Sequence, residues 1–422
     1  MKNWAGNYEY QAANFHHPRS VDEICQLVRR SIKAKVLGSR HSFNDIADSP
    51  GDLISLQHFD RVLAIDDYRA PPTVVVEGGI TYGRLSGYLH ARGYALHNLA
   101  SLPHISVAGA CATATHGSGT QNGNLATAVC GMEIVRPDGM VEVLSRKETG
   151  ESFDGMVVSL GGLGVITKLS LDLVPAFEVR QDVYENLPLS SVQQHFDQIF
   201  SAAYSISLFT DWSGAFFNQA WLKRRITEVP EDPLPPKFFG ATLATQPLHP
   251  ILGVPATHCT EQMGIPGPWQ ERLPHFRMDF TPSNGDELQS EYLVPRENAL
   301  NGLAALAGLR EDLAPLLQVA EVRTVAADKL WMSPCYETPC VAFHFTWRNE
   351  WPALKTLLPK LESALAPFNA RPHWGKLFTM QPEELHSRYP RLADFRKLAH
   401  SRDPEGKFNN RFLDRYIYQL PT

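Results

Sequence analysis

The spacing of apolar and polar residues predicts a run of short helices and strands over the first 175 residues. Apolar residues three and four apart follow the capping box Ser20–Glu23, so we expect a helix over 20–33, and a second one over 81–92. Alternation and short apolar runs predict strands over 35–37, 73–77 and 164–175, and a hairpin over 132–144 that turns at Pro137-Asp138-Gly139. Elements of both kinds, joined by Gly-rich segments, predict an α+β fold.

From about residue 176 to 370 the pattern changes to strands with fewer helices. Strand-like segments lie at 205–212, 218–225 and 341–347, and a helix is expected near 296–308. Pro and Gly are frequent over 229–274, which predicts long loops. This part is therefore expected to form an antiparallel sheet with helices on one side.

Length and composition narrow the class of protein. At 422 residues the chain exceeds one ordinary core, which favours two domains. Its 39 basic and 45 acidic residues give a net charge of −6 without any basic run, which argues against a nucleic-acid or membrane-surface binder. No signal peptide or membrane-spanning stretch is evident. Six cysteines without a C-x-x-C pair predict reduced thiols in a cytoplasmic protein, with no disulfide framework and no metal site.

Two segments that combine Gly with Ser or Thr, which we call the Gly-rich segments, carry candidate ligand chemistry. In VLGSRHSFNDIAD (36–48) the chain bends at Gly38, and the next residues offer three hydrogen-bond donors in a turn suited to an anion. LASLPHISVAGACATATHGSGTQNGN (99–124) is so rich in small residues that a planar or phosphorylated ligand could lie against its backbone. Neither G-x-G-x-x-G nor a P-loop occurs, which disfavours a nicotinamide-binding domain or a P-loop enzyme.

Two strand segments place polar residues on one face. Glu321 and Arg323 are two apart, and His344 and Thr346 repeat this spacing among aromatic residues that face the other way. A single E-x-R pair is more often a solvated pair on an exposed strand. His and Thr alternating with an apolar face instead suit the wall of a pocket within a sheet.

The motifs GSRHSFND, SLPHISVAGACATATHGSG and GGLGVIT (161–167), in this order, resemble the FAD-binding domain of vanillyl-alcohol-oxidase-type flavoproteins. Within that family EVRTVAADKLWMSP, FHFTW, RPHWGK and GKFNNRF (406–412) resemble the alditol oxidases. The resemblance covers essentially the whole chain. It implies an α+β, two-domain flavoprotein. The FAD-binding domain, of two small α/β subdomains, would comprise 1–175 and 371–422, and the substrate domain, an antiparallel sheet covered by helices, 176–370.

By this resemblance the cofactor is FAD, attached covalently to the flavin ring methyl through His41. A neutral imidazole nitrogen is a competent nucleophile for that bond. Ala114 stands where a glycine is more usual. The residues implied to bind FAD are Gly38, Ser39, Arg40, His41, Ser42, Ser101, Ser106, Gly109, Thr113, Ala114, Thr115, His116, Ile166 and His373.

The resemblance also implies a polyol substrate, whose terminal primary hydroxyl is oxidised to an aldehyde while O2 becomes H2O2. The catalytic residues would be His344, Lys376 and Arg323, with the choice between His344 and Lys376 as proton acceptor left open. The small Ala100 favours access of O2, hence an oxidase. The implied partners are a polyol and O2, and the protein is expected to be a monomer. The residues implied to bind the polyol are Ser101, Gln289, Glu321, Arg323, His344, Thr346 and Lys376.

Two other functions remain in competition. Within the same fold, an aldonolactone oxidase or dehydrogenase would share the HWGK motif. A flavin-binding carrier or sensor without turnover would not need the charged groups that converge on two strands. Preference among alditols depends on residues 229–295, whose arrangement the sequence does not give.

Overall fold

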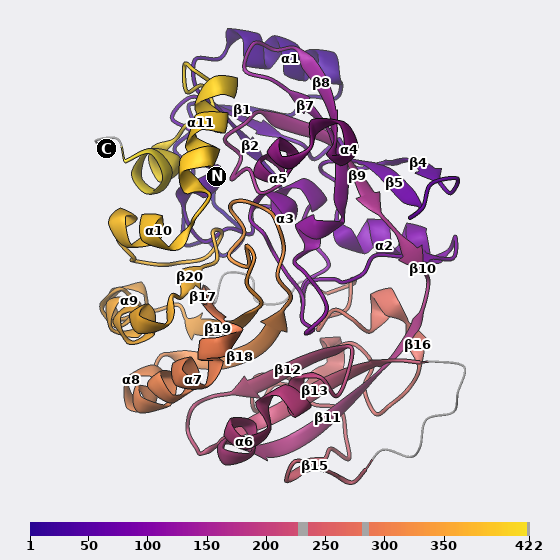
Figure 1. Cartoon of the computed structure of the whole chain (residues 1–422), viewed down its shortest axis with the longest axis vertical. Helices are drawn as coiled ribbons and strands as arrows, with labels where there is room; N and C mark the ends of the chain where they lie inside the picture. The colour runs from indigo at the N-terminus through magenta and orange to yellow at the C-terminus, as the bar shows by residue number, and fades with distance from the viewer. Residues whose placement is uncertain (227–234, 281–286, 420–422) are drawn as a thin grey trace.

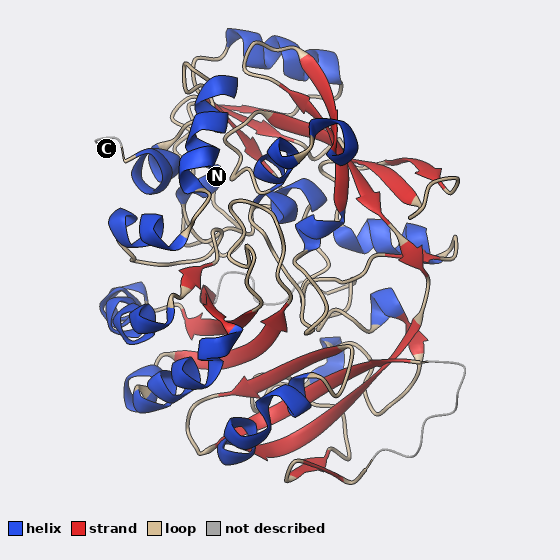
Figure 2. Ribbon diagram, in the orientation of Figure 1, coloured by secondary structure: helices blue, strands red, loops and turns tan. Residues whose placement is uncertain are grey.

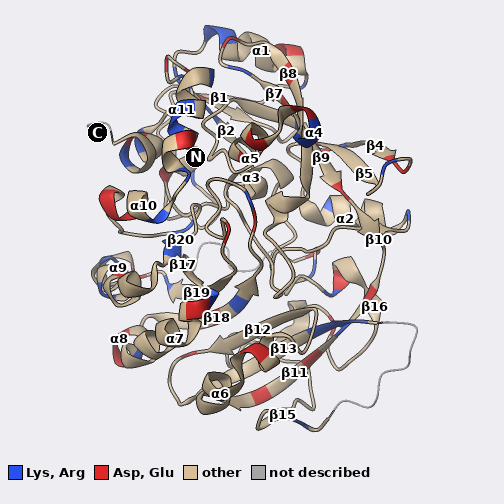
Figure 3. Cartoon of the chain, viewed as in Figure 1, with Lys and Arg blue, Asp and Glu red and all other residues tan. Residues whose placement is uncertain are grey.

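The computed structural model describes residues 1–226, 235–280 and 287–419. Figure 1 shows two small sheets in the upper part of the molecule and one large sheet in the lower part. The upper part holds the N-terminal segments and, beside them, the yellow C-terminal helices. Acidic and basic residues are interspersed over both parts (Figure 3), as expected from the nearly balanced composition.

The first small sheet is parallel and ends at the first Gly-rich segment. Its order is β1 (Asn14–His16), β3 (Asp52–Ser55) and β2 (Ala34–Leu37). Helix α1 (Val21–Arg30) begins as predicted, because the Ser20 side chain accepts a hydrogen bond from the Glu23 N–H. It ends three residues earlier than predicted because Ser31 is extended and caps it.

The second small sheet is antiparallel. Its order is β4 (Val62–Asp66), β5 (Thr73–Glu77), β9 (Val165–Asp172), β7 (Val129–Val135) and β8 (Val141–Ser145). The predicted hairpin is confirmed as β7 and β8, and the predicted helix over 81–92 is α2 (Tyr82–His90). Other elements here are α3 (Val107–Ala112), α4 (Arg146–Thr149), α5 (Glu151–Val157), β6 (Tyr94–Ala95) and β10 (Val174–Pro175).

The large sheet is built almost entirely from antiparallel pairs in the order β14-β15-β11-β13-β12-β18-β19-β17-β20, with β16 beside β11. Its long strands are β11 (Glu178–Pro188), β12 (Ser205–Thr210), β13 (Phe216–Arg225), β17 (Glu287–Pro295), β18 (Leu317–Val325) and β19 (Cys340–Arg348). Its short strands are β14 (Lys237–Phe238), β15 (Ala241–Leu243), β16 (Gly267–Pro268) and β20 (Arg371–Pro372). The α+β class with a helix-covered antiparallel sheet is therefore confirmed.

Helices cover one face of the large sheet, as Figure 2 shows. They are α6 (Leu189–Phe200), α7 (Ala299–Gly308), α8 (Arg310–Leu313) and α9 (Trp351–Leu365). Alternate strand residues such as Val322, Phe343 and Phe345 pack against them in one core. The residues between these alternate positions point to the opposite face, toward the upper part of the molecule.

The chain returns to the upper part after the large sheet. Helices α10 (Pro382–Arg388), α11 (Leu392–Arg402) and α12 (Arg411–Leu413) lie there, and Asn410 donates hydrogen bonds to the carbonyls of Asp45, Ile46 and Asp48. Of the predicted loop region, 229–234 lies outside the described residues, and the rest contains only short elements. No helix within the described ranges is both long and apolar enough to cross a bilayer.

Candidate active site

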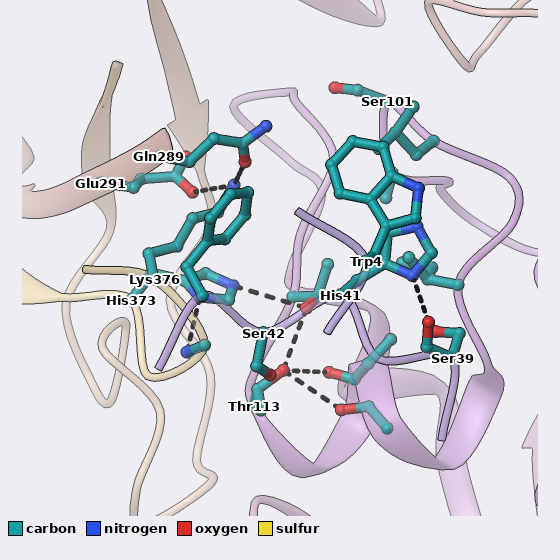
Figure 4. Close-up of a pocket in the computed structure, with 18 of the residues that line it drawn as sticks. Trp4, Ser39, His41, Ser42, Ser101, Thr113, Gln289, Glu291, His373 and Lys376 are labelled. Carbon is teal, nitrogen blue, oxygen red and sulfur yellow. Dashed lines mark hydrogen bonds and ion pairs between the residues drawn. The ribbon is translucent and has the colours of Figure 1, made fainter. Parts of the chain in front are cut away.

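A cavity of about 570 Å³ lies between the Gly-rich segments and the uncovered face of the large sheet. Its walls come from both parts of the molecule, and Figure 4 shows some of the side chains that line it. A volume in this range suits a large organic ligand.

The first wall is the turn after β2. A Cβ on Gly38 would lie 2.4 Å from the Ser106 Oγ, so only glycine permits this close approach of two chain segments. The Ser106 N–H donates to the Ser39 Oγ at 3.1 Å, which fixes the two Gly-rich segments to each other. Arg40 has a φ of 63°, and its exposed side chain turns back to the Lys2 carbonyl. The sequence-predicted Gly38, Ser39, Ser42, Ser106 and Gly109 all line the cavity, as does Arg40.

His41 lies at the centre of this turn, under an aromatic ring. Trp4 stacks on it with ring centroids 5.0 Å apart and an interplanar angle of 19° (Figure 4). The His41 Nδ1 is 3.0 Å from the Ser39 carbonyl, so Nδ1 carries a proton, and the buried Nε2 has no partner among the described residues. Burial, with smaller effects of His104 and Lys376, lowers the pKa of His41 to about 4, so its ring is neutral near pH 7.

The second Gly-rich segment continues the wall through a chain of hydroxyl and imidazole groups. Thr113 Oγ1 is 3.1 Å from Thr115 Oγ1, which is 3.4 Å from the His373 Nε2. The Gly375 N–H donates to the His373 Nδ1, so the proton of this imidazole is on Nε2, next to Thr115. Ser101 and His116 also line the cavity, whereas Ala114 and Ile166 belong to the neighbouring core and are not in its described lining.

The opposite wall is the uncovered face of β17, β18 and β19. Glu321 and Arg323 on β18, and His344 and Thr346 on β19, point into the cavity because their neighbours Val322, Phe343 and Phe345 point into the core. Gln289 on β17 extends this wall, and Lys376 donates a hydrogen bond to its side-chain oxygen. All the sequence-predicted polyol-binding residues thus line one cavity.

Glu291, which the sequence analysis missed, lies at the centre of these charges. Its Oε1 accepts from Arg323 at 2.7 Å and is 3.3 Å from the His116 Nε2. Its Oε2 is 3.5 Å from the His344 Nδ1 and 3.9 Å from the Lys376 Nζ. Burial by itself would raise the pKa of Glu291, but His116 and Arg323 outweigh it and hold that pKa well below its usual range, so this carboxylate is ionised.

Burial has different consequences for the two candidate proton acceptors. It lowers the pKa of His344 to about 4, with a further contribution from Lys376. It lowers the pKa of Lys376 to about 8, although Glu291 opposes the shift. Near neutral pH a part of the Lys376 population is therefore an uncharged amine, which can accept a proton.

Sequence reasoning missed two residues of this site, Glu291 and His275, and only the first had a pattern that could have revealed it. Glu291 is two residues from Gln289, so the alternation used for β18 and β19 would have found it had 287–295 been predicted as a strand. His275 donates from its backbone N–H to the Ser101 carbonyl and is 2.8 Å from Glu321 through its ring. It lies in the Pro-rich region, where no periodicity marks it.

Two family models match this chain. One, described as an FAD binding domain, matches residues 12–145, and the other, described as D-arabinono-1,4-lactone oxidase, matches residues 283–416. The first match contains both Gly-rich segments, and the second contains the polar faces of β17, β18 and β19.

Proteins of known activity align over nearly the whole length. An alditol oxidase from a Streptomyces species is 50% identical over 415 residues, 98% of each chain. An L-gulono-1,4-lactone dehydrogenase from Mycobacterium tuberculosis is 28% identical over 98% of each chain, and an L-gulonolactone oxidase from Mus musculus is 25% identical over 99% of this chain and 98% of its own. Among solved structures, cholesterol oxidase from B. sterolicum superposes with a TM-score of 0.79 at 13% identity, covering 99% of this chain and 96% of that one, which is a likeness of fold.

Proposed function

The chain belongs to the alditol oxidase family of FAD-binding oxidoreductases, and from this premise we propose that it oxidises the terminal primary hydroxyl of alditols such as xylitol and sorbitol. The products would be the aldose and H2O2. The observation that carries the proposal is the polar face of β17, β18 and β19, which lines one cavity with the two Gly-rich segments.

The residues of the upper wall fit FAD. The buried Ser106 Oγ and His41 Nε2 have no hydrogen-bond partner within the described part of the chain, as expected of groups that await a ligand. Gly38 and Gly109 line the cavity without a side chain, so a pyrophosphate could lie close to their backbone. Bound FAD would supply the two-electron acceptor for the hydride of the alcohol carbon, with O2 as the final acceptor of the electron pair.

We propose further that His41 holds the flavin covalently. Support comes from its neutral imidazole, from the buried nitrogen without a partner, and from Trp4, which fixes the ring plane. A neutral imidazole keeps a lone pair for bond formation, whereas a protonated one does not.

The opposite wall would bind the polyol hydroxyls. Each polyol hydroxyl both donates and accepts hydrogen bonds. Glu321 offers acceptors and Arg323 offers donors, whereas Thr346 and Gln289 can each donate and accept. An analogue without these hydroxyls would leave buried charged groups unpaired, so the site should discriminate against it.

Lys376 is proposed as the group that takes the hydroxyl proton at its Nζ. Its pKa of about 8 is nearer to neutral pH than the pKa of about 4 of His344, and proton transfer is most efficient when the pKa of the acceptor is near the working pH. The His344 Nε2 is 3.3 Å from the Thr346 Oγ1 and its Nδ1 is 3.4 Å from the Lys376 Nζ, so His344 would orient the amine. Ala100, which lines the cavity next to Ser101, leaves room for O2.

The free thiols of all six cysteines support a reducing, cytoplasmic setting, and we propose that the protein acts there as a monomer. Light scattering during size-exclusion chromatography would test the monomer: a mass near 47.1 kDa is expected, and twice that value would contradict it.

The experiment that tests the proposed function is anaerobic titration of the purified yellow protein with alditol. Xylitol or sorbitol should bleach the flavin absorbance, and admission of air should restore it with release of H2O2. Bleaching by L-gulono-1,4-lactone but not by alditols would instead establish a lactone oxidase or dehydrogenase. A protein that neither ligand class bleaches would be a flavin carrier.

Acid precipitation tests the covalent bond. The pellet of the unsubstituted protein should stay yellow, and the pellet of His41→Ala should be colourless.

A further inference from the structure

We propose that Lys223 and His275 form a buried hydrogen-bonded pair that orients the Glu321 carboxylate, and that they are thereby positioning residues for substrate recognition. The inference rests on the proposed function, since Glu321 is placed there in the alditol site. It concerns two side chains that this function does not use.

Lys223 on β13 has all three ammonium protons directed at acceptors. Its Nζ is 2.6 Å from the Leu273 carbonyl, 2.9 Å from the Pro274 carbonyl and 3.1 Å from the His275 Nδ1. The side chain is 1% exposed, so water does not compete for these protons. Burial lowers the pKa of Lys223 to about 7, but three acceptors within hydrogen-bond distance of Nζ favour the ammonium form, whose third proton points at the His275 Nδ1.

The contact between His275 and Glu321 places the imidazole proton on the other ring nitrogen, Nε2. The His275 Nε2 is 2.8 Å from the Glu321 Oε1, with the Ser207 Oγ more distant at 3.5 Å. An ionised carboxylate only accepts hydrogen bonds, so Nε2 must carry the proton. Burial lowers the pKa of His275 to about 4, so the ring is neutral near pH 7 and has a single N–H. The contact with Glu321 and the contact with Lys223 each require that proton on Nε2, so the two ends of the pair agree on one tautomer.

The imidazole has no freedom to turn away. The rings of Phe209 and Trp221 meet it edge-on, with centroids 5.5 Å and 5.3 Å from the His275 ring. Its backbone N–H donates to the Ser101 carbonyl at 3.1 Å. His275 therefore links a residue of the second Gly-rich segment to a residue of the large sheet, and both are proposed to bind the polyol.

The pair determines where the Glu321 oxygens lie. Oε1 is held by His275, and Oε2 is 3.5 Å from the Arg323 Nε. A carboxylate held at both oxygens presents its remaining lone pairs in fixed directions, so a substrate hydroxyl finds a preformed acceptor. Loss of the His275 contact would let the carboxylate turn toward Arg323 and weaken alditol binding.

Two amide substitutions at one position test this directly in the FAD-loaded protein. The amide of His275→Gln reaches about as far as Nε2 and can still donate to Glu321. The amide of His275→Asn reaches only about as far as Nδ1, so it satisfies Lys223 but not Glu321. Because hydrogen bonds to charged groups are worth tenfold or more in binding, we expect KM for xylitol to rise about tenfold in His275→Asn, with kcat changed by less than about threefold. His275→Gln should stay within about threefold of the unsubstituted protein in both.

A second comparison keeps the inference testable if the Asn variant folds poorly. In Glu321→Ala the acceptor that His275 orients is already lost, so adding Lys223→Met to it should raise KM no further, whereas Lys223→Met alone should raise it. Equal KM values for His275→Asn and His275→Gln, or a Lys223→Met effect that multiplies that of Glu321→Ala, would overturn the inference. The proposed function is judged separately, by whether alditol bleaches the unsubstituted protein at all.

Discussion

At the scale of the residue, the two nitrogens next to Glu291 differ in what they can do at neutral pH. Burial lowers the pKa of Lys376 to about 8, against the opposing effect of Glu291, and burial together with the charge of Lys376 lowers the pKa of His344 to about 4. Only one of these groups changes its protonation state in the range where the enzyme would work. The pH dependence of the reaction therefore distinguishes them.

Flavin reduction by alditol should speed up as the pH rises. The proposed proton acceptor is the uncharged amine of Lys376, so the rate should increase from pH 6, reach half of its maximum near pH 8 and level off above about pH 9. Anaerobic stopped-flow measurements of the bleaching rate from pH 5 to 10 would show this. A rate that is constant above pH 5 would assign the proton acceptor to His344.

The substitution Lys376→Met removes the proposed proton acceptor, so it should slow bleaching of the flavin by about a hundredfold or more.

Replacement of Glu291 by Gln should have two measurable effects. It removes the carboxylate that opposes the fall in the pKa of Lys376, so the inflection of the rate profile should move to lower pH. It also removes the carboxylate charge that pairs with the buried Arg323 guanidinium. Denaturant titration should therefore show a free energy of unfolding that is lower by about 3–5 kcal/mol. Glu271→Gln is the matched control, because its side chain is 64% exposed and should change neither quantity.

At the scale of the element, the N-terminal segment packs over the turn that carries His41 and is hydrogen-bonded to it. The backbone N–H of Trp4 donates to the Arg40 carbonyl at 2.8 Å, and the side-chain amide of Asn3 donates to the Ser42 carbonyl at 2.9 Å. These bonds hold a turn whose Arg40 has a positive φ, an arrangement that costs about 1–3 kcal/mol on its own. The Trp4 ring then stacks on the imidazole itself.

Removal of the Trp4 ring should therefore reduce covalent attachment more than it reduces FAD binding. In Trp4→Ala we expect a smaller fraction of the flavin to remain with the acid-precipitated protein, and a larger fraction in the supernatant. Absorbance of the two fractions near 450 nm measures this. Trp351→Ala removes a tryptophan that is 40% exposed on α9 and serves as the control. Equal acid-stable fractions in both variants would refute the role of Trp4.

The strands were predictable where the polar alternation was unbroken. On β18 and β19, period-2 spacing placed Glu321 with Arg323 and His344 with Thr346, and the structure has each pair on one face. On β17 the same spacing was present, but no arrangement was predicted for residues 229–295, so this strand was not identified. His275 could not be predicted, because its partners Lys223 and Glu321 are about 50 residues away in either direction and no local pattern links them.

At the scale of the whole molecule, the cavity is closed by segments from both parts, so a bound cofactor would couple their stabilities. A ligand that binds the folded state alone raises the free energy of unfolding with its concentration. If His41 holds the flavin covalently, added FAD should not change the melting temperature of the intact protein. In His41→Ala the melting temperature should instead rise as FAD is added, by an amount equivalent to about 2.7 kcal/mol at a hundredfold excess over Kd.

The α+β class and the return of the chain after residue 371 followed from motifs that are local in the sequence. The packing of the parts did not, because it depends on contacts such as Asn410 with the turn at 45–48 and His275 with Ser101. These contacts join residues hundreds of positions apart, or residues in irregular segments, and neither periodicity nor propensity reports on them.

The wide separation of the cavity-lining residues along the chain has a consequence for biosynthesis. The lining begins at Trp4 and ends at Lys376, and Asn44 donates to the Trp374 and Lys376 carbonyls. A ribosome makes the chain from the N-terminus, so the first Gly-rich turn is complete long before its opposite wall exists. The cavity therefore closes only when nearly all of the chain has been made, and the proposed attachment of flavin to His41 would belong to the end of translation or to the time after it.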